Sequence, residues 1–159
     1  MLSNFELEEY CKMQGIKLNY CGYKDTMKKR KVLSYNAIIN LDGESPYDGN
    51  VAGSHWVCLI IKNKEAFYFD SFGFGCPIET SNLVTIQKLH HFGHNVKHIQ
   101  HIKSERCGYY CVALLRYVEE NYTNNLYDVV DGFMNMFDEN TNNNEKILIT
   151  YLKQRGIFA

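Results

Sequence analysis

The order of apolar and polar residues predicts a helix at the start of the chain and a strand hairpin near its middle. Ser3 followed by Glu6 forms a capping-box pattern, and apolar residues then recur at helical spacing until Gly15. Two β-prone runs, Trp56–Ile61 and Ala66–Phe72, are separated by four residues and therefore predict a hairpin. The first run is apolar at every position, which is typical of a strand buried on both faces.

Weaker patterns flank this hairpin. Residues 17–54 are polar and irregular, and within them a short apolar piece, Tyr35–Leu41, fits a small helix or a strand. After the hairpin we expect a helix over about residues 79–92 and a shorter strand over about residues 96–102.

The strongest helical pattern begins at Cys107. Apolar residues recur from there every three or four positions as far as Val118, and Ser104 is placed to cap the helix. Two amphipathic helices follow, over about residues 126–137 and 147–152. Because no repeat or linker interrupts the chain, we expect residues 1–159 to form one α+β domain with a small central sheet.

Composition narrows the class of protein. The chain has 159 residues, of which 45% are hydrophobic and 22% charged, so it is not a disordered chain. Its net charge of −1 does not draw the whole molecule to nucleic acid or an anionic membrane. No apolar run approaches the roughly 20 residues that a membrane span needs.

The six cysteines are unusual for this composition. In a small secreted protein an even number suggests a disulfide framework. The N-terminal residues are acidic and amphipathic, however, and do not resemble a signal peptide. We therefore expect a reducing setting, in which most of these thiols are small buried hydrophobes and one is reactive.

Three residues with acid–base or nucleophilic side chains fall at the borders of the predicted elements. His55 precedes the first hairpin strand and Asp70 lies near the end of the second. In a hairpin centred near residue 63, position 55 pairs with about position 71, so His55 and Asp70 should be neighbours. A carboxylate beside an imidazole fixes its tautomer and stabilises its protonated form. Cys107 begins the strongest helix, where the helix dipole favours a thiolate.

Two further residues complete this candidate site. Gly108 leaves room for a substrate carbonyl, and Gln100 can offer its side-chain amide to an oxyanion, with the Cys107 backbone N–H as the second donor. Each residue type also has a simpler interpretation, since a cysteine on an apolar stripe is usually a core residue and an aspartate before a turn usually starts that turn. It is their joint placement that favours nucleophilic catalysis.

Three motifs carry a resemblance to a known family: Gly53-Ser-His-Trp-Val57, Tyr68-Phe-Asp-Ser-Phe-Gly73 and Gln100-His-Ile-Lys-Ser-Glu-Arg-Cys107-Gly-Tyr-Tyr-Cys111. In order and spacing they resemble adenain, the adenovirus maturation protease, and its relatives. These relatives include the SUMO- and NEDD8-processing proteases and the maturation proteases of virophages and Polinton-type elements. The resemblance is strong over about residues 53–115, faint upstream and weak in the C-terminal third.

The resemblance implies a papain-like cysteine protease fold of the adenain/Ulp type, with a small central mixed β-sheet packed by helices. It implies that Cys107 is the nucleophile, His55 the general base and Asp70 the acid that orients it. Gln100 would supply the oxyanion-hole donor. Trp56 matches a residue that walls a narrow channel admitting glycine near the scissile bond, which implies a glycine-containing cleavage site; a core anchor is the alternative.

The chain also departs from adenain, which is activated by a disulfide-linked capsid-derived peptide and by DNA. No cysteine lies between Cys76 and Cys107, where adenain carries the one that binds the peptide. We therefore expect no obligatory cofactor. The basic run Lys28–Lys31 could contact nucleic acid, but such runs are usually solvated, so nucleic acid is not required.

On this interpretation the partners are viral capsid or structural precursor proteins, cleaved as substrates. We expect no bound metal and no membrane association, and we expect a monomer. The resemblance places the protein in the virion and in the host-cell cytoplasm or nucleus.

Three other functions stay open. A protease that removes ubiquitin-like modifiers would share this site. A metal-binding protein is another possibility, because five histidines lie between residues 90 and 101 and His90 and His94 are four positions apart. A non-catalytic module that binds ubiquitin-like tails is the third, although the complete set of triad residues argues against it.

Overall fold

The structure, a computed structural model, describes residues 1–43 and 55–158. Its elements are α1 (Asn4–Met13), β1 (Tyr20–Tyr23), β2 (Tyr35–Asn40), β3 (Trp56–Lys62), β4 (Glu65–Phe69), α2 (Ile78–Thr85), β5 (His91–His94), α3 (Cys107–Asn121), α4 (Leu126–Met134), the 3-10 turn η1 (Thr141–Asn143) and α5 (Asn144–Lys153). Gly53 and Ser54, which belong to the first motif, and most of the turn-rich stretch before them lie outside the described residues.

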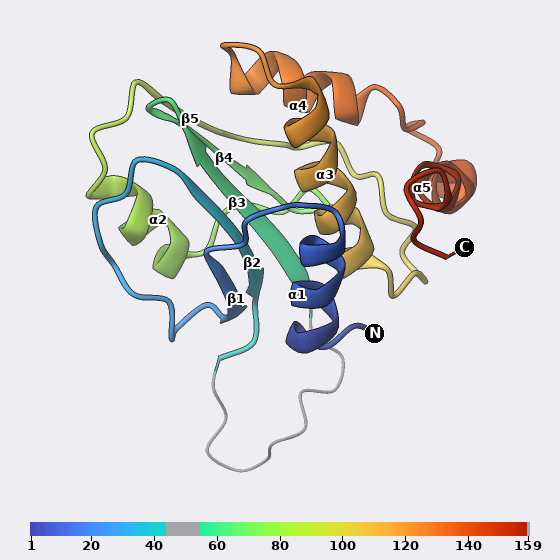
Figure 1. The fold of residues 1–159 in the computed structure, drawn as a ribbon, viewed down its shortest axis with the longest axis horizontal. Helices are drawn as coiled ribbons and strands as arrows, with labels where there is room; N and C mark the ends of the chain where they lie inside the picture. The colour runs from blue at the N-terminus through green and yellow to red at the C-terminus, as the bar shows by residue number, and fades with distance from the viewer. Residues whose placement is uncertain (44–54, 159) are drawn as a thin grey trace.

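The five strands form one mixed sheet in the order β1-β2-β3-β4-β5. The outer pairs, β1 with β2 and β4 with β5, are parallel, and the two inner pairs are antiparallel. Helices cover both faces: α1, α3 and α4 lie on one side and α2 on the other (Figure 1). This arrangement confirms the expected α+β fold with a small, mixed central sheet.

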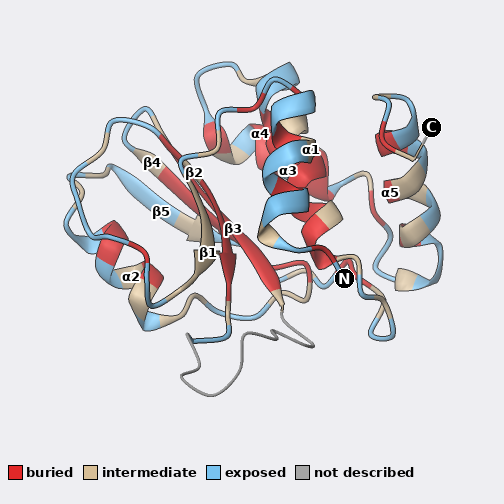
Figure 2. Cartoon of the chain, turned by 60° about the horizontal axis from the view of Figure 1, so that its bottom comes forward, coloured by how far each residue is buried: buried red, intermediate tan, exposed pale blue. Residues whose placement is uncertain are grey.

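Strand β3 is buried on both faces, as its continuous apolar run predicts. Because side chains alternate along a strand, Trp56, Cys58 and Ile60 join the core beneath α1 and α3. Their neighbours Val57, Leu59 and Ile61 join the second core, which includes residues of α2. Figure 2 shows β3 buried in the middle of the sheet.

Strands β3 and β4 form the predicted hairpin, with a register one position from the expected one. Asn63 and Lys64 have φ angles of 50° and 63°, as a tight two-residue turn with both central residues left-handed requires. Cys58 is paired with Phe69, so the hairpin is centred between residues 63 and 64. Residue 55 therefore aligns with residue 72 rather than 71.

The two outermost strands differ from the expectation. The ambiguous segment at residues 35–41 is a strand, β2, and residues 20–23 form a further strand, β1, that the pattern does not predict. The helix expected over residues 79–92 ends at Thr85. The strand expected over residues 96–102 is wrong, because the strand β5 lies earlier, at His91–His94.

The helices at the two ends follow the sequence pattern more closely. Ser3 and Glu6 form the predicted capping box at the start of α1, and α3 begins at Cys107 as expected. The cap of α3 is a correction: Arg106 holds the N-cap position without a side-chain cap, and the Ser104 hydroxyl accepts from the Arg106 amide instead. Within the described residues, no helix has the length and apolar character needed to cross a membrane.

Candidate active site

The β3–β4 hairpin and the distant helix α3 bring His55, Asp70 and Cys107 together. His55 immediately precedes β3, Asp70 immediately follows β4, and Cys107 is the first residue of α3. His55 Nε2 lies 2.6 Å from Asp70 Oδ1. The His55 side chain also forms a hydrogen bond with the side chain of Cys107. Because Nε2 is engaged with Asp70, Nδ1 is the ring nitrogen left to face the sulfur.

The environment of His55 favours its protonated form. Burial alone lowers the pKa of the imidazole, but the hydrogen bond to Asp70 and the one to Cys107 outweigh it, and together they raise the pKa from 6.5 to about 9. The ring of Phe72 packs on the imidazole with a centroid distance of 4.9 Å. An imidazolium beside a thiol is the arrangement that supports a thiolate nucleophile.

Asp70 is held entirely inside the protein, with no solvent exposure. Its Oδ1 accepts from His55 and also from the backbone N–H of Phe72, at 2.8 Å. Its main chain forms two hydrogen bonds with the side chain of Asn95, which accepts from the Asp70 N–H and donates to the Asp70 carbonyl. A buried carboxylate so fixed can orient an imidazole without moving.

Cys107 is 2% exposed, and the backbone N–H of Trp56 donates to its Sγ at 3.3 Å. The other thiols lie in environments that oppose ionisation. Burial raises the pKa of Cys11 and Cys21 to about 12, and raises that of the three remaining thiols.

Gln100 is buried next to this cluster, whereas a glutamine in a strand usually faces solvent. Its Oε1 accepts a short hydrogen bond from the Ser71 hydroxyl, and its Nε2 donates to the Ser104 carbonyl at 2.9 Å. The Gln100 backbone N–H also bonds the Ser71 carbonyl. Because a carbonyl can only accept, these contacts fix the orientation of the amide. Gln100 is thereby joined to the residue that follows Asp70.

Trp56 and Gly108 lie beside Cys107 and both contact the N-terminal residues. Trp56 is 4% exposed, and its indole N–H donates to the Leu2 carbonyl at 3.0 Å. At Gly108 a Cβ would lie 3.0 Å from Leu7 and 3.3 Å from Leu2. The missing side chain therefore allows α1 and the N-terminal residues to pack closely, and a role of Gly108 in admitting a substrate carbonyl stays a prediction.

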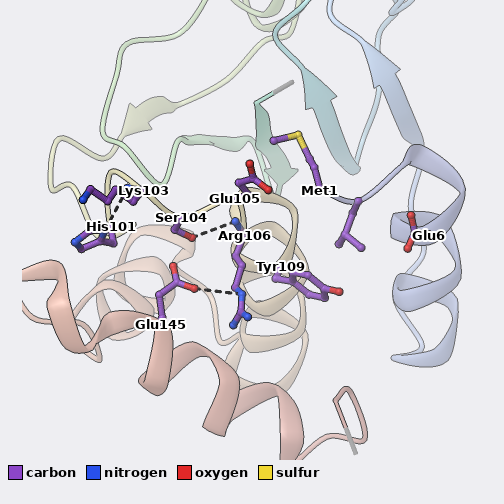
Figure 3. A pocket seen from close by; sticks show the side chains of 10 residues that line it. Met1, Glu6, His101, Lys103, Ser104, Glu105, Arg106, Tyr109 and Glu145 are labelled. Atoms are coloured by element: carbon purple, nitrogen blue, oxygen red, sulfur yellow. Dashed lines mark hydrogen bonds and ion pairs between the residues drawn. The ribbon is translucent and has the colours of Figure 1, made fainter. Parts of the chain in front are cut away.

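Two cavities lie near this cluster: Met1 and Leu2 line both, and neither lining includes His55, Asp70 or Cys107. The first, about 700 Å³, lies beside the loop that leads into Cys107 and includes Ser104, Arg106 and Glu145. Figure 3 shows Arg106 between Ser104 and Glu145, with its side chain paired to Glu145 at 3.4 Å. The second, about 510 Å³, is lined by Trp56 together with residues of β1 and α1.

The histidines after residue 89 do not form the metal pair that their spacing allows. His91–His94 are extended in β5, which separates the Cα atoms of His90 and His94 by roughly 13 Å, rather than the single turn of a helix. Among the described residues, no three His, Cys, Asp or Glu side chains are placed to share a metal ion. The structure therefore contradicts the helical metal pair.

Sequence reasoning missed Asn95 and Ser71. Asn95 follows the strand β5, which the pattern placed elsewhere, and Ser71 lies inside a matched motif but had no assigned role. The only available signal was their residue type, since Asn and Ser are frequent partners of backbone groups in turns. Residue type alone does not show that Asn95 bonds Asp70 or that Ser71 bonds Gln100; only the fold does.

No protein-family model and no curated protein sequence matches the chain. Several solved structures match its fold, and two of them are described here. The ASFV pS273R protease aligns with a TM-score of 0.53 and 16% identity, over 78% of this chain and 59% of the other. ChlaDub1 from Chlamydia trachomatis aligns with a TM-score of 0.52 and 15% identity, over 77% of this chain and 60% of the other. The chain thus spans about three fifths of each structure. The mixed sheet with its covering helices has the fold of the Ulp/adenain-type cysteine proteases.

Proposed function

We propose that the protein is a cysteine endopeptidase that cleaves viral capsid or other structural precursor proteins, at sites containing glycine. The observation that carries the proposal is the contact chain from Asp70 through His55 to Cys107, built by three separate elements. A fold shared with the ASFV pS273R protease supports the same reaction class. The viral substrate and the glycine preference rest on the resemblance of the three motifs to the adenain family.

The proposed reaction begins with Cys107 as a thiolate and His55 as an imidazolium. The thiolate attacks the scissile carbonyl, and His55 gives its proton to the leaving amine as the peptide bond breaks. His55 is then neutral and takes a proton from water, which attacks the thioester and releases the acid product. Asp70 keeps its hydrogen bond to the imidazole throughout and stabilises the imidazolium.

Gln100 and the backbone N–H of Cys107 are the proposed oxyanion donors. One Nε2 hydrogen of Gln100 is used by the Ser104 carbonyl, which leaves the second for a substrate oxygen. Removing one donor of this kind typically lowers kcat by ~10²–10³-fold. Arg106, next to Cys107 in the chain, lines one cavity, and Trp56, next to His55, lines the other, so both cavities offer room for substrate near the proposed triad.

A second candidate is a protease that removes ubiquitin-like modifiers. The fold similarity to ChlaDub1 favours it, and it would use the same three side chains. The two candidates differ only in substrate, so they are separated by offering both classes. Cleavage of capsid precursors but not of modifier conjugates supports viral maturation, and the reverse pattern supports modifier removal.

The mechanism is tested by alanine variants at the proposed triad. We expect Cys107→Ala to abolish cleavage and His55→Ala to lower kcat by at least ~10²-fold, because general acid–base catalysis contributes ~10²–10⁴-fold. Cys76→Ala is the matched control, since it removes another thiol outside the cluster. Circular dichroism checks that the variants are folded. Turnover retained in Cys107→Ala would overturn the mechanism.

A further inference from the structure

Asn95 is placed against Asp70 by the parallel pairing of β4 and β5. Tyr68 is paired with His94 in this ladder, and Asp70 and Asn95 lie just beyond the two paired strands. Because the carboxyl ends of parallel strands meet at the same edge of a sheet, residues that follow the two strands become neighbours. Asp70 lies past the last residue of β4, so the sheet ladder itself does not hold it.

The side chain of Asn95 holds the Asp70 main chain on both sides. Its Oδ1 accepts from the Asp70 N–H at 3.1 Å, and its Nδ2 donates to the Asp70 carbonyl at 2.7 Å and to the Lys97 carbonyl at 3.1 Å. The side chain is buried, with Asn95 7% exposed. A backbone N–H only donates and a carbonyl only accepts, so one orientation of the amide satisfies all three bonds.

This contact sets the position of the groups that face His55. The Asp70 carboxylate reaches His55 directly, and Cys107 is the other titratable group bonded to the imidazole. The ring of Phe72 covers the imidazole and has His98 on a further side. The three hydrogen bonds of the Asn95 side chain all go to main-chain atoms of Asp70 and Lys97, so they act on His55 through the placement of Asp70.

We propose that Asn95 is a positioning residue, whose side-chain amide fixes the Asp70 backbone so that the carboxylate meets His55 Nε2. The inference rests on the proposed catalytic triad. Asn95 is not itself a catalytic residue, because its side-chain hydrogen bonds go to main-chain atoms and not to the reacting groups.

The test is the pKa of the His55 imidazole, measured by NMR on histidine-labelled protein and assigned with His55→Gln. Asn95→Leu has a similar size and lacks the three hydrogen bonds. We expect the His55 pKa to fall by about one unit or more in this variant, because an opposite charge within hydrogen-bond reach raises a histidine pKa by about 1–3 units. In an active preparation, kcat should fall by about tenfold or more while KM changes little.

Asn144 provides a matched control. It is also buried, and its side chain bonds the Asp138 main chain in the same way. It accepts from the Asp138 N–H and donates to the Asp138 carbonyl and to the Ile99 carbonyl. Asn144→Leu should therefore lose similar stability while the His55 pKa stays at its wild-type value. A purely structural role for Asn95 predicts the same result for both variants.

The outcomes are distinct. An unchanged His55 pKa in folded Asn95→Leu overturns the proposal. Asn95→Ala is the second variant, because it avoids the branched side chain; if neither Asn95 variant folds while Asn144→Leu does, Asn95 is only a folding contact and the proposal is also overturned. The pKa measurement needs no substrate. Absence of cleavage by the wild-type protein would therefore refute the proposed function. The comparison of the His55 pKa between the Asn95 and Asn144 variants would still decide the role of Asn95.

Discussion

The imidazole of His55 lies between two groups that favour its charge, although burial opposes it. The Asp70 carboxylate is fully buried and bonds Nε2 at 2.6 Å, and the Cys107 side chain is the second partner. A charge held in this way is available at neutral pH, where an ordinary histidine is mostly neutral. The chemistry proposed for the site depends on that retained proton.

This retained proton predicts a dependence of stability on pH. The His55 pKa is raised from 6.5 to about 9, so its stabilising contribution is complete below pH 6.5 and is lost as the pH rises through about 9. We expect the difference in unfolding free energy between wild type and His55→Gln to shrink by roughly 1–3 kcal/mol between pH 6 and pH 10. Urea denaturation at both pH values measures it, and a constant difference would contradict the assignment.

The candidate site residues that can be predicted from the sequence are those with a reactive side chain. The residue types and spacing of His55, Asp70 and Cys107 predicted their neighbourhood, even though the hairpin register was off by one. The packing around Gly108 could not be predicted, because its neighbours Leu2 and Leu7 lie far away in sequence. Asn95 could not be found, because its bonds are to backbone atoms that only the fold brings near.

At the scale of elements, the pairing of the edge strand β5 with β4 determines where the residues that follow these two strands lie. Strand β5 is four residues long and mostly exposed, and its sequence, His-Phe-Gly-His, has neither apolar alternation nor β-branched residues. The central strand β3 has a strong pattern because both of its faces are buried. Short edge strands have little buried surface, so their position depends on the neighbouring strand more than on their own composition.

The packing of β5 against α4 predicts a large effect at Gly93. A Cβ at this position would lie 2.3 Å from the Tyr127 ring, and that ring is held by a hydrogen bond to the Ala66 carbonyl and by contact with Phe67. We expect Gly93→Ala to lower the unfolding free energy by about 1–3 kcal/mol, the usual cost of overpacking.

Gly75 is the matched control for this prediction. A Cβ there meets nothing within 4 Å, so Gly75→Ala should change stability by no more than ~0.5 kcal/mol. Thermal denaturation of both variants checks the comparison. Equal stability of the two variants would show that β5 does not pack against Tyr127.

At the scale of the whole molecule, one polar network joins the first helix, α3 and the C-terminal residues. Arg155 binds both carboxylate oxygens of Glu120, at 2.7 and 2.8 Å, and Arg116 binds Glu120 at 2.7 Å. Arg116 also donates to the Gln14 carbonyl, and the Gln14 side chain donates to the Arg155 carbonyl. The α1 and α3 helices, which pack together beside Cys107, are thereby tied to the end of the described chain.

This network predicts a stability effect that disappears in acid. The hydrogen bond from Arg155 is the main cause that lowers the Glu120 pKa from 4.5 to about 2. The stabilisation is present above pH 4.5 and is lost as the pH falls through about 2. Because these side chains are partly exposed, we expect Glu120→Gln to cost at most about 1 kcal/mol at pH 7.

The Glu120→Gln cost should decline steadily as urea denaturation is repeated at lower pH. Glu119→Gln is the matched control, because Glu119 is the neighbouring exposed carboxylate on the same helix, and it should leave stability unchanged. An effect of Glu120→Gln that is the same at pH 7 and pH 3 would mean that the charge of Glu120 does not matter.

The most direct test of the proposed protease is a comparison of cleavage sites produced by the wild-type protein and by Cys107→Ala. Both proteins are incubated with a denatured proteome and with capsid precursors, and new N-termini are identified by mass spectrometry. We predict cleavage after or near glycine that depends wholly on Cys107. Identical profiles for the two proteins, or cleavage that persists in Cys107→Ala, would contradict the assignment of a thiol protease.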